Sequence, residues 1–173
     1  MSTGHNLAGA HGRLSHNLAE RCLKDPEVRK LLHRYEHLDD SYDIPYLAGY
    51  STDGKTIYVD RHLPEKLEYE HDGRKREYDP RRFLIDHESM EKALIDALGW
   101  GYDHAHEAAT AYERRQVLES GLSWKPYQEA YRPYIKADEH EKVTKVPSDL
   151  DLTPYADDTL LLRHMKRKMR GHG

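Results

Sequence analysis

The chain has 173 residues, enough for one domain of ordinary size, and 37% of them are hydrophobic while 34% are charged. No stretch approaches the roughly 18 consecutive apolar residues of a transmembrane helix, and the first ten residues lack the basic start and apolar core of a secretory signal. The net charge of −4 understates the acidity of the main body, because residues 163–173 hold five basic side chains and no acidic one. An acidic body does not favour general nucleic-acid binding. The single cysteine, Cys22, can form no disulfide within the chain, so we expect a cytoplasmic protein.

The first part of the chain predicts two short helices. Residues 1–13 are small and polar, and we expect them to be mobile. A first helix is predicted over residues 14–23 from its apolar spacing. Asp25-Pro26 combines an N-cap with a proline at the first helical position. The second helix is therefore predicted to begin there and to run to about Leu38, with a loop over residues 39–43.

The next part of the chain predicts β-hairpins. Two β-segments, 44–50 and 56–60, flank Asp53-Gly54, which is a strong signal for a hairpin turn. A second hairpin is predicted around Asp72-Gly73. Its strands are heavily charged, so we expect it to be an edge or a protruding loop.

Three longer helices follow. Asp79-Pro80 repeats the N-cap and proline signature and opens a helix predicted over residues 81–98, which Gly99 ends. Further helices are predicted over residues 102–120 and 124–135.

The remaining residues predict how the domain is completed. Residues 138–158 are polar and contain two prolines, which indicates an extended wrapping segment, and residues 159–170 predict a short final helix. We therefore expect one α+β domain over residues 14–137, in which a small antiparallel sheet packs against a helical core. Residues 138–173 would form the wrapping segment and a basic C-terminal tail.

The helix predicted over residues 81–98 carries the most informative side chains, His87, Glu88 and Glu91. His87 and Glu91 are four residues apart, so they stack on one helix face with Cβ atoms about 5–6 Å apart. Two ligands at this spacing can share one metal ion. Glu88 lies roughly 100° further around the helix. From there it can reach a water on the ion and act as a general base.

A third ligand can come from the next predicted helix. His106 lies on the inward face of that helix with Glu113 near it, whereas His104 points roughly 160° away. His87, Glu91 and His106 would then form a His₂Glu set, a known composition for catalytic zinc that leaves a fourth position open for water. Glu113 is expected to orient a ligand histidine, and Glu113 or His104 is the alternative ligand.

The two helices resemble the core of zincin-type metallopeptidases. The resemblance rests on His87-Glu88-x-x-Glu91, a glycine turn, and Tyr102-x-x-Ala105-His106-x-x-Ala109-x-x-x-Glu113. It covers residues 44–135, is of the minimal gluzincin type, and is closest to small uncharacterised proteins of bacteria and their phages. It includes the hairpin over residues 46–64, since an edge strand in zincins lies beside the active-site helix and binds substrate backbone. The departure is Glu91, where the family usually has a histidine.

The resemblance implies a zinc-dependent hydrolase that cuts a peptide or protein substrate, encoded by a phage or prophage. Glu88 would take the proton of the attacking water and pass it to the leaving amine. Tyr102 is the candidate for stabilising the oxyanion. No membrane partner is implied, and the basic tail from Arg163 to Arg170 is the one candidate for contact with nucleic acid.

Simpler interpretations of the same residues remain open. His87 and Glu91 could be a hydrogen-bonded pair at a contact between helices, because buried carboxylates need partners. Glu88 and Lys92 could be a surface ion pair at i, i+4 spacing. A dinuclear carboxylate site is disfavoured, because it requires Glu-x-x-His on each of two helices and neither predicted helix has that motif.

Two further alternatives concern the role of a metal ion. A non-catalytic interaction or accessory protein could use the ion only to clamp two helices, and a fourth protein ligand, Glu113 or His104, would indicate that role. His33 and His37 are also four residues apart, but Arg34 follows the first of them. A cation at that position repels a metal, so we interpret this pair as solvated surface.

Overall fold

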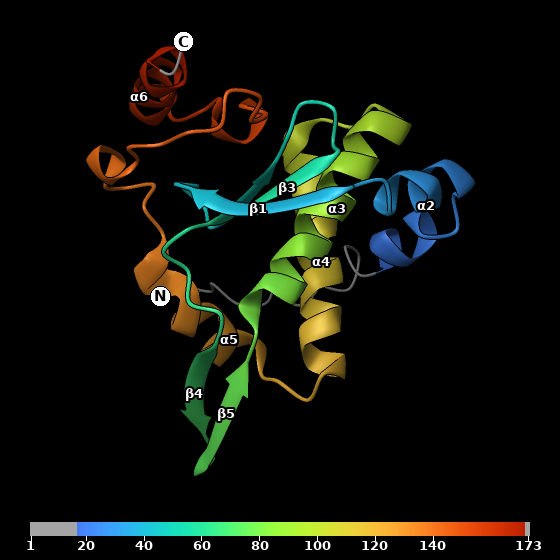
Figure 1. Ribbon diagram of the computed structural model, residues 1–173. Coiled ribbons are helices and arrows are strands. Elements are labelled where there is room, and N and C mark those ends of the chain that lie inside the picture. Colours follow the sequence, from blue (N-terminus) through green and yellow to red (C-terminus); the bar gives the residue numbers. More distant parts are fainter. Residues whose placement is uncertain (1–16, 172–173) are drawn as a thin grey trace, which may run out of the picture.

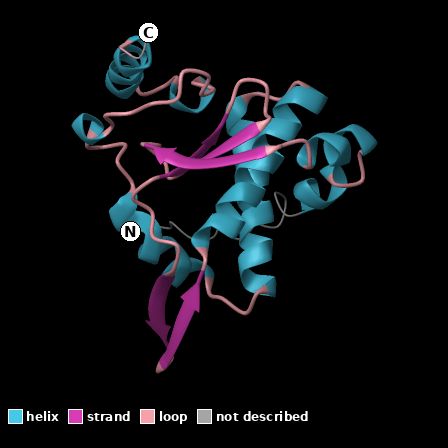
Figure 2. Cartoon of the chain, in the orientation of Figure 1, coloured by secondary structure: helices cyan, strands magenta, loops and turns pink. Residues whose placement is uncertain are grey.

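The computed structural model describes residues 17–171 and confirms the α+β class (Figures 1 and 2). Residues 17–22 are helical, in agreement with the first predicted helix. The start of that helix and the expectation of a mobile segment over residues 1–13 lie outside the described residues. Within residues 17–171, every helix is too short or too polar to cross a bilayer.

The second helix begins as predicted but ends early. Helix α2 (Pro26–Leu32) is capped by Asp25, whose side chain accepts hydrogen bonds from two backbone N–H groups of the first turn. Residues expected to finish this helix and to form a loop instead make strand β1 (His37–Tyr42), so the predicted extension to Leu38 is wrong. The strand exists because it pairs with a segment almost twenty residues further along, and such long-range pairing overrides a local helical pattern.

Two hairpins occur at the predicted turns. Strands β2 (Ala48–Tyr50) and β3 (Thr56–Asp60) pair antiparallel around Gly54, which takes the left-handed conformation that glycine favours. The strand order is β1-β3-β2, so β2 is an edge strand; β1 joins β3 in parallel, and the sheet is mixed. Strands β4 (Leu67–His71) and β5 (Arg74–Tyr78) form the second hairpin, which protrudes from the domain (Figure 1).

The core of the fold is a pair of antiparallel helices, α3 (Pro80–Leu98) and α4 (Tyr102–Glu119), which lie side by side (Figure 1). The Asp79 side chain caps α3 at its start, and Gly99 ends it in a left-handed conformation. The contact between the helices is lined by fully buried small side chains, namely Ala93, Ala105, Ala108 and Ala109. Helix α5 (Trp124–Tyr131) then packs against the hairpin of β4 and β5.

The C-terminal segment, which we define as residues 136–171, returns to the sheet. It contains short 3₁₀ turns at His140–Lys142 and Thr153–Tyr155 and ends in the predicted final helix, α6 (Thr159–Arg170). Helix α6 buries Leu161 and Met165 in a cluster shared with the sheet region. The basic residues at the end of the chain therefore belong largely to a docked helix.

A buried ion-pair network joins this C-terminal segment to the sheet. The Lys136 Nζ donates hydrogen bonds to Asp43 Oδ1 at 3.0 Å and to both carboxylate oxygens of Asp60 at 2.8 and 2.9 Å. Both aspartates are essentially inaccessible to solvent. Asp43 also accepts two hydrogen bonds from Arg61. Burial opposes the charged form of Asp43, but the hydrogen bonds of Arg61, Thr144 and Lys136 hold its pKa well below the usual value.

Replacing this lysine should therefore destabilise the fold. Lys136→Met leaves two buried carboxylates without their shared ammonium group, which costs about 3–5 kcal/mol of unfolding free energy in comparable buried pairs. Urea denaturation measures this change. Lys125→Met is the matched control, because Lys125 is exposed and its nearest carboxylate is 3.9 Å away. Equal stability of the two variants would show that the network contributes nothing.

Candidate metal centre

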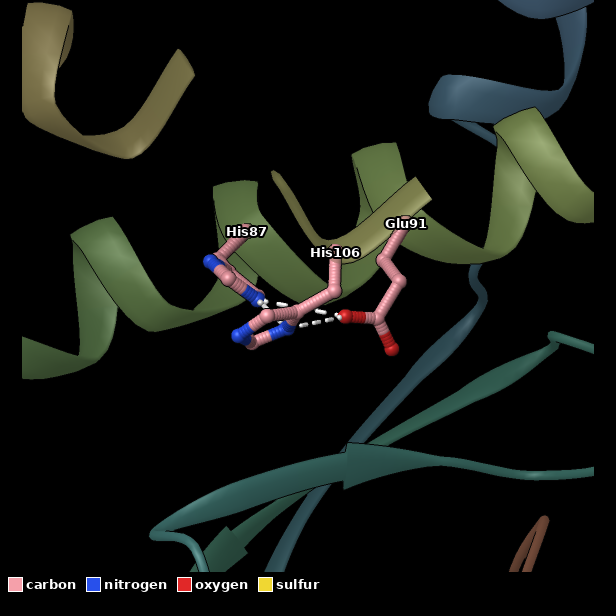
Figure 3. Close-up of side chains that lie close together, drawn as sticks. All are labelled: His87, Glu91 and His106. Atoms are coloured by element: carbon pink, nitrogen blue, oxygen red, sulfur yellow. Dashed lines mark hydrogen bonds and ion pairs between the residues drawn. The ribbon is translucent and has the colours of Figure 1, made fainter. Parts of the chain in front are cut away.

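Three potential metal ligands converge between α3 and α4 (Figure 3). The Nε2 of His87 lies 3.3 Å from Glu91 Oε2 and 3.2 Å from His106 Nδ1, and the last two atoms are 2.8 Å apart. The three side chains point toward one another and toward the sheet. The His₂Glu set expected from the sequence is thus brought together, and the group could hold a metal ion.

Local sequence signals explain how the two helices present these side chains. The i, i+4 spacing puts His87 and Glu91 on one face of α3. Gly99 ends α3, and α4 begins after Gly101, so the chain reverses within a few residues. His106 lies in the second turn of α4 and therefore comes back alongside Glu91.

A second carboxylate fixes the orientation of the His87 ring. The Nδ1 of His87 is 2.8 Å from Glu113 Oε2, and the other oxygen of Glu113 accepts a hydrogen bond of 2.7 Å from the Tyr127 hydroxyl. Burial lowers the pKa of His87, but hydrogen bonds with Glu113 and Glu91 outweigh that effect and raise it well above its ordinary value. With Nδ1–H donating to Glu113, Nε2 becomes available as a ligand once a metal ion displaces its proton.

Glu91 is held by partners on both of its oxygens. Its Oε1 accepts a hydrogen bond of 2.8 Å from the Tyr50 hydroxyl, while Oε2 faces the two histidines. Burial acts to raise the pKa of Glu91, but the hydrogen bonds with His106 and His87 outweigh it and lower the pKa to about 2. The carboxylate therefore carries a full negative charge in the cluster at neutral pH.

Glu88 lies beside the cluster in a cavity of about 440 Å³. It is 8% exposed, and it makes no hydrogen bond with any residue in the described part of the chain. Burial raises the pKa of Glu88 to about 8, and the charge of Glu91 adds to the rise. The surface ion pair with Lys92 is absent, because Lys92 is itself buried and its Nζ binds Asp151 Oδ2 at 3.1 Å.

The other candidate residues take different positions. Tyr102 lines the cavity, and its hydroxyl is 3.4 Å from His106 Nδ1. Glu113 contacts the far nitrogen of His87 and is outside the group of three. The His104 ring packs at a tilt against Trp100, with ring centroids 4.1 Å apart. Within residues 17–171, neither of the two alternative ligands therefore belongs to the cluster.

The rival histidine pair does not form a site. Because α2 ends at Leu32, His33 caps that helix while His37 starts strand β1, so the two residues share no helix face. Their assignment to the surface is confirmed, because both His33 and His37 are exposed.

A second group with the spacing of metal ligands is Asp43, Asp60 and His62. The ammonium group of Lys136 already occupies its centre, at 2.8 Å from Asp60 Oδ2 and 2.6 Å from His62 Nδ1. A cation bound there would have to displace a buried lysine, so we interpret this group as part of the structural ion-pair network.

Sequence reasoning missed two residues that support the cluster, Tyr50 and Tyr127. Tyr50 comes from strand β2 and Tyr127 from α5, and both are almost completely buried. Burial raises the pKa of both hydroxyls, so they stay neutral and donate to carboxylates. The only available signal is general: a buried tyrosine needs a partner for its hydroxyl.

No protein-family model, curated protein or solved structure matches the chain. The resemblance to zincins thus finds no support among known proteins, and the cluster of potential ligands stands on its geometry.

The geometry predicts which histidines a bound metal requires. His87→Ala and His106→Ala should each lose zinc, since each removes one of three ligand atoms. Elemental analysis of protein purified without a histidine tag measures the metal content.

His104→Ala and His33→Ala are the matched controls, because both remove a histidine outside the cluster, and both variants should keep the metal. If the His87 variant retains as much zinc as the wild type, the cluster is a hydrogen-bonded structural pair and not a metal site.

Proposed function

We propose that the chain is a zinc-dependent hydrolase of the minimal zincin type that cuts amide bonds in peptides. One observation carries the proposal: three ligand atoms converge on one point, and the carboxyl of Glu88 lies beside them with no hydrogen-bond partner among the described residues. A metal ligand set next to a carboxyl that faces a cavity is the arrangement that metal-assisted hydrolysis requires.

The donor set fits zinc in both chemistry and spacing. Zinc bonds of about 2.0–2.2 Å in a tetrahedron separate neighbouring ligand atoms by about 3.3–3.5 Å. The three observed separations are 2.8, 3.2 and 3.3 Å, so a small outward shift of Glu91 or His106 would accommodate the ion. Two imidazoles and one carboxylate suit zinc better than hard cations, which prefer oxygen ligands alone.

Hydrogen bonds around the ligands also support this proposal. Glu113 on the Nδ1 of His87 is the typical partner that fixes a ligand histidine in its metal-binding tautomer. Tyr50 holds the oxygen of Glu91 that faces away from the histidines. These hydrogen bonds already hold the ligand side chains in position, so little conformational entropy is lost when an ion binds.

The proposed reaction assigns a role to each residue near the cluster. Bound zinc supplies a Lewis acid that polarises a carbonyl and lowers the pKa of a water. Glu88 takes the proton of that water and delivers it to the leaving amine. Burial raises the pKa of Glu88 and favours its protonated form, whereas a cation bound beside it would lower that pKa and favour the carboxylate that a base requires. Tyr102, whose hydroxyl is held neutral because burial raises its pKa, is the donor for the developing oxyanion.

A purely structural ion is the competing proposal, and it calls for a closed shell of four protein ligands. Within the described residues, neither candidate for a fourth ligand faces the cluster. Glu113 contacts the Nδ1 of His87, which points away from the cluster, and the His104 ring packs against Trp100. Three protein ligands and an adjoining cavity favour a metal ion whose fourth coordination position is open to water and substrate.

Two glutamine variants separate the roles of the glutamates. Glu88→Gln keeps the shape and removes the base, so it should preserve zinc while lowering the peptidase rate by about 10²–10⁴-fold. Glu91→Gln should weaken zinc binding, because a neutral amide is a poorer ligand than a carboxylate. Melting temperature with and without a chelator reports the difference: a large shift for Glu88→Gln and a small one for Glu91→Gln.

Each variant is the control for the other, since both change one carboxylate to an amide on the same helix. Loss of zinc in Glu88→Gln would make that residue a ligand and would overturn the hydrolase mechanism. Equal zinc content in both variants would rule out Glu91 as a ligand.

A further inference from the structure

The open edge of strand β2, which borders the cavity, is unusually short. The register with β3 decides which backbone groups of β2 face the open edge. Leu47 and Ser51 hydrogen-bond to β3, so the alternate residues Ala48 and Tyr50 point their N–H and C=O groups to the opposite side. Upstream, Leu47 has a left-handed φ of 76° and its N–H closes a turn onto Ile44. The strand therefore offers no edge before Ala48.

The chain's own C-terminal segment covers the other end of this edge. The N–H of Asp151 donates to Tyr50 O at 2.9 Å, and the N–H of Thr52 donates to Asp149 O at 2.8 Å. The pairing is antiparallel, with Leu150 opposite Ser51. We call residues 149–151 the edge segment. An ion pair between Asp151 and Lys92 of α3 fixes it in place.

These two boundaries leave Ala48 as the one β2 residue with both N–H and C=O on the open side. Ala48 also lines the cavity next to Glu88, and no backbone or side-chain hydrogen bond from a described residue fills that side of it. A substrate strand can thus pair with a single residue of the edge. Extended peptides that bind along an edge strand pair with several residues in succession, whereas among the described residues of this edge only Ala48 has both groups unpaired.

The edge segment also sets which end of a substrate fits. A strand that adds antiparallel to β2 beside Ala48 lies in line with residues 149–151 and would continue from their C-terminal end. Its own N-terminal side is therefore blocked. A strand added in the parallel sense would be blocked on its C-terminal side, and it would need a partner for a terminal carboxylate.

The charges of the cavity decide between these two orientations. Among the described residues that line it, the acidic ones are Glu88, Glu91 and Glu113, and there is no lysine or arginine. The remaining walls are largely aromatic and aliphatic, and they include Trp124 and Tyr155. Among these described residues there is no basic side chain to pair with a terminal carboxylate, whereas the aromatic rings can face an ammonium group.

We propose that the site acts on the free amino-terminal end of peptides, in the manner of an aminopeptidase, because the edge of β2 offers a substrate strand one fully open residue, Ala48, and the edge segment occupies the edge beyond it. This inference rests on the proposed function, since it names the substrate of that same site. Hydrolysis consumes one water, breaks the amide bond after the terminal residue, and gives a free amino acid and a shortened peptide.

The test uses the full, zinc-loaded chain and three probes. These are a leucine-containing tetrapeptide with a free amino terminus, the same peptide N-acetylated, and a longer peptide blocked at both ends. We expect kcat/KM for the free tetrapeptide to exceed that for the acetylated one by about 10-fold or more, with release of the first amino acid and no cleavage of the blocked peptide.

Two results would overturn the inference in different ways. Equal rates on the free and acetylated tetrapeptides, or internal cleavage of the blocked peptide, would contradict the choice of the amino terminus and leave the proposed hydrolase intact. If the zinc-loaded chain cuts none of the probes, the proposed function fails, and the inference fails with it.

A variant tests the edge segment itself. Asp151→Ala removes the ion pair with Lys92 and should loosen the segment, so the ratio of free to acetylated rates should fall toward one. Asp157→Ala is the matched control, because Asp157 is exposed further along the same part of the chain. Melting curves establish that both variants fold, and an unchanged ratio in folded Asp151→Ala would show that the segment does not limit the substrate.

Discussion

The close packing of α3 on α4 is the constraint on which the candidate site depends. Side chains at a helix contact set the distance between the helix axes, and here α4 contributes three fully buried alanines, Ala105, Ala108 and Ala109, to the cluster that it shares with α3. Small side chains let the backbones approach until His106 reaches the Nε2 of His87 and the Oε2 of Glu91. Larger residues at these positions would separate the helices and disperse the three atoms.

Close packing also buries carboxylates, and the rest of the fold offsets that cost. An ionised carboxylate away from water is expensive unless hydrogen bonds satisfy it. Tyr50 reaches Glu91 from the sheet, and Tyr127 reaches Glu113 from α5. The sheet and α5, which both line the cavity beside the cluster, therefore hold its carboxylates in one geometry. Glu88 is the exception, since no described residue supplies it with a hydrogen bond, and a carboxyl that faces a cavity with its pKa raised by burial is typical of a residue that takes part in chemistry.

The C-terminal segment contributes both to the stability of the fold and to the limits on how a substrate can reach the β2 edge. Lys136 ties the beginning of this segment to the sheet through two buried aspartates, and Asp151 ties a later part to α3. Near the second anchor, the edge segment pairs with the end of β2 and covers that part of the strand edge. The same contacts that complete the hydrophobic core around the sheet thus also limit the length of edge left beside Glu88.

The sequence by itself determined the elements whose signals are local. The Asp79 cap and Gly99 bounded α3, the glycine turn at Gly54 placed a hairpin, and helical periodicity put His87 and Glu91 on one face, because each of these depends on neighbours within a few residues. Only the tertiary structure decided that His37–Tyr42 is a strand, since its partner β3 lies far along the chain. It alone brought Tyr50 and Tyr127 to the carboxylates and the edge segment to β2, because contacts between distant segments leave no periodic trace in a sequence.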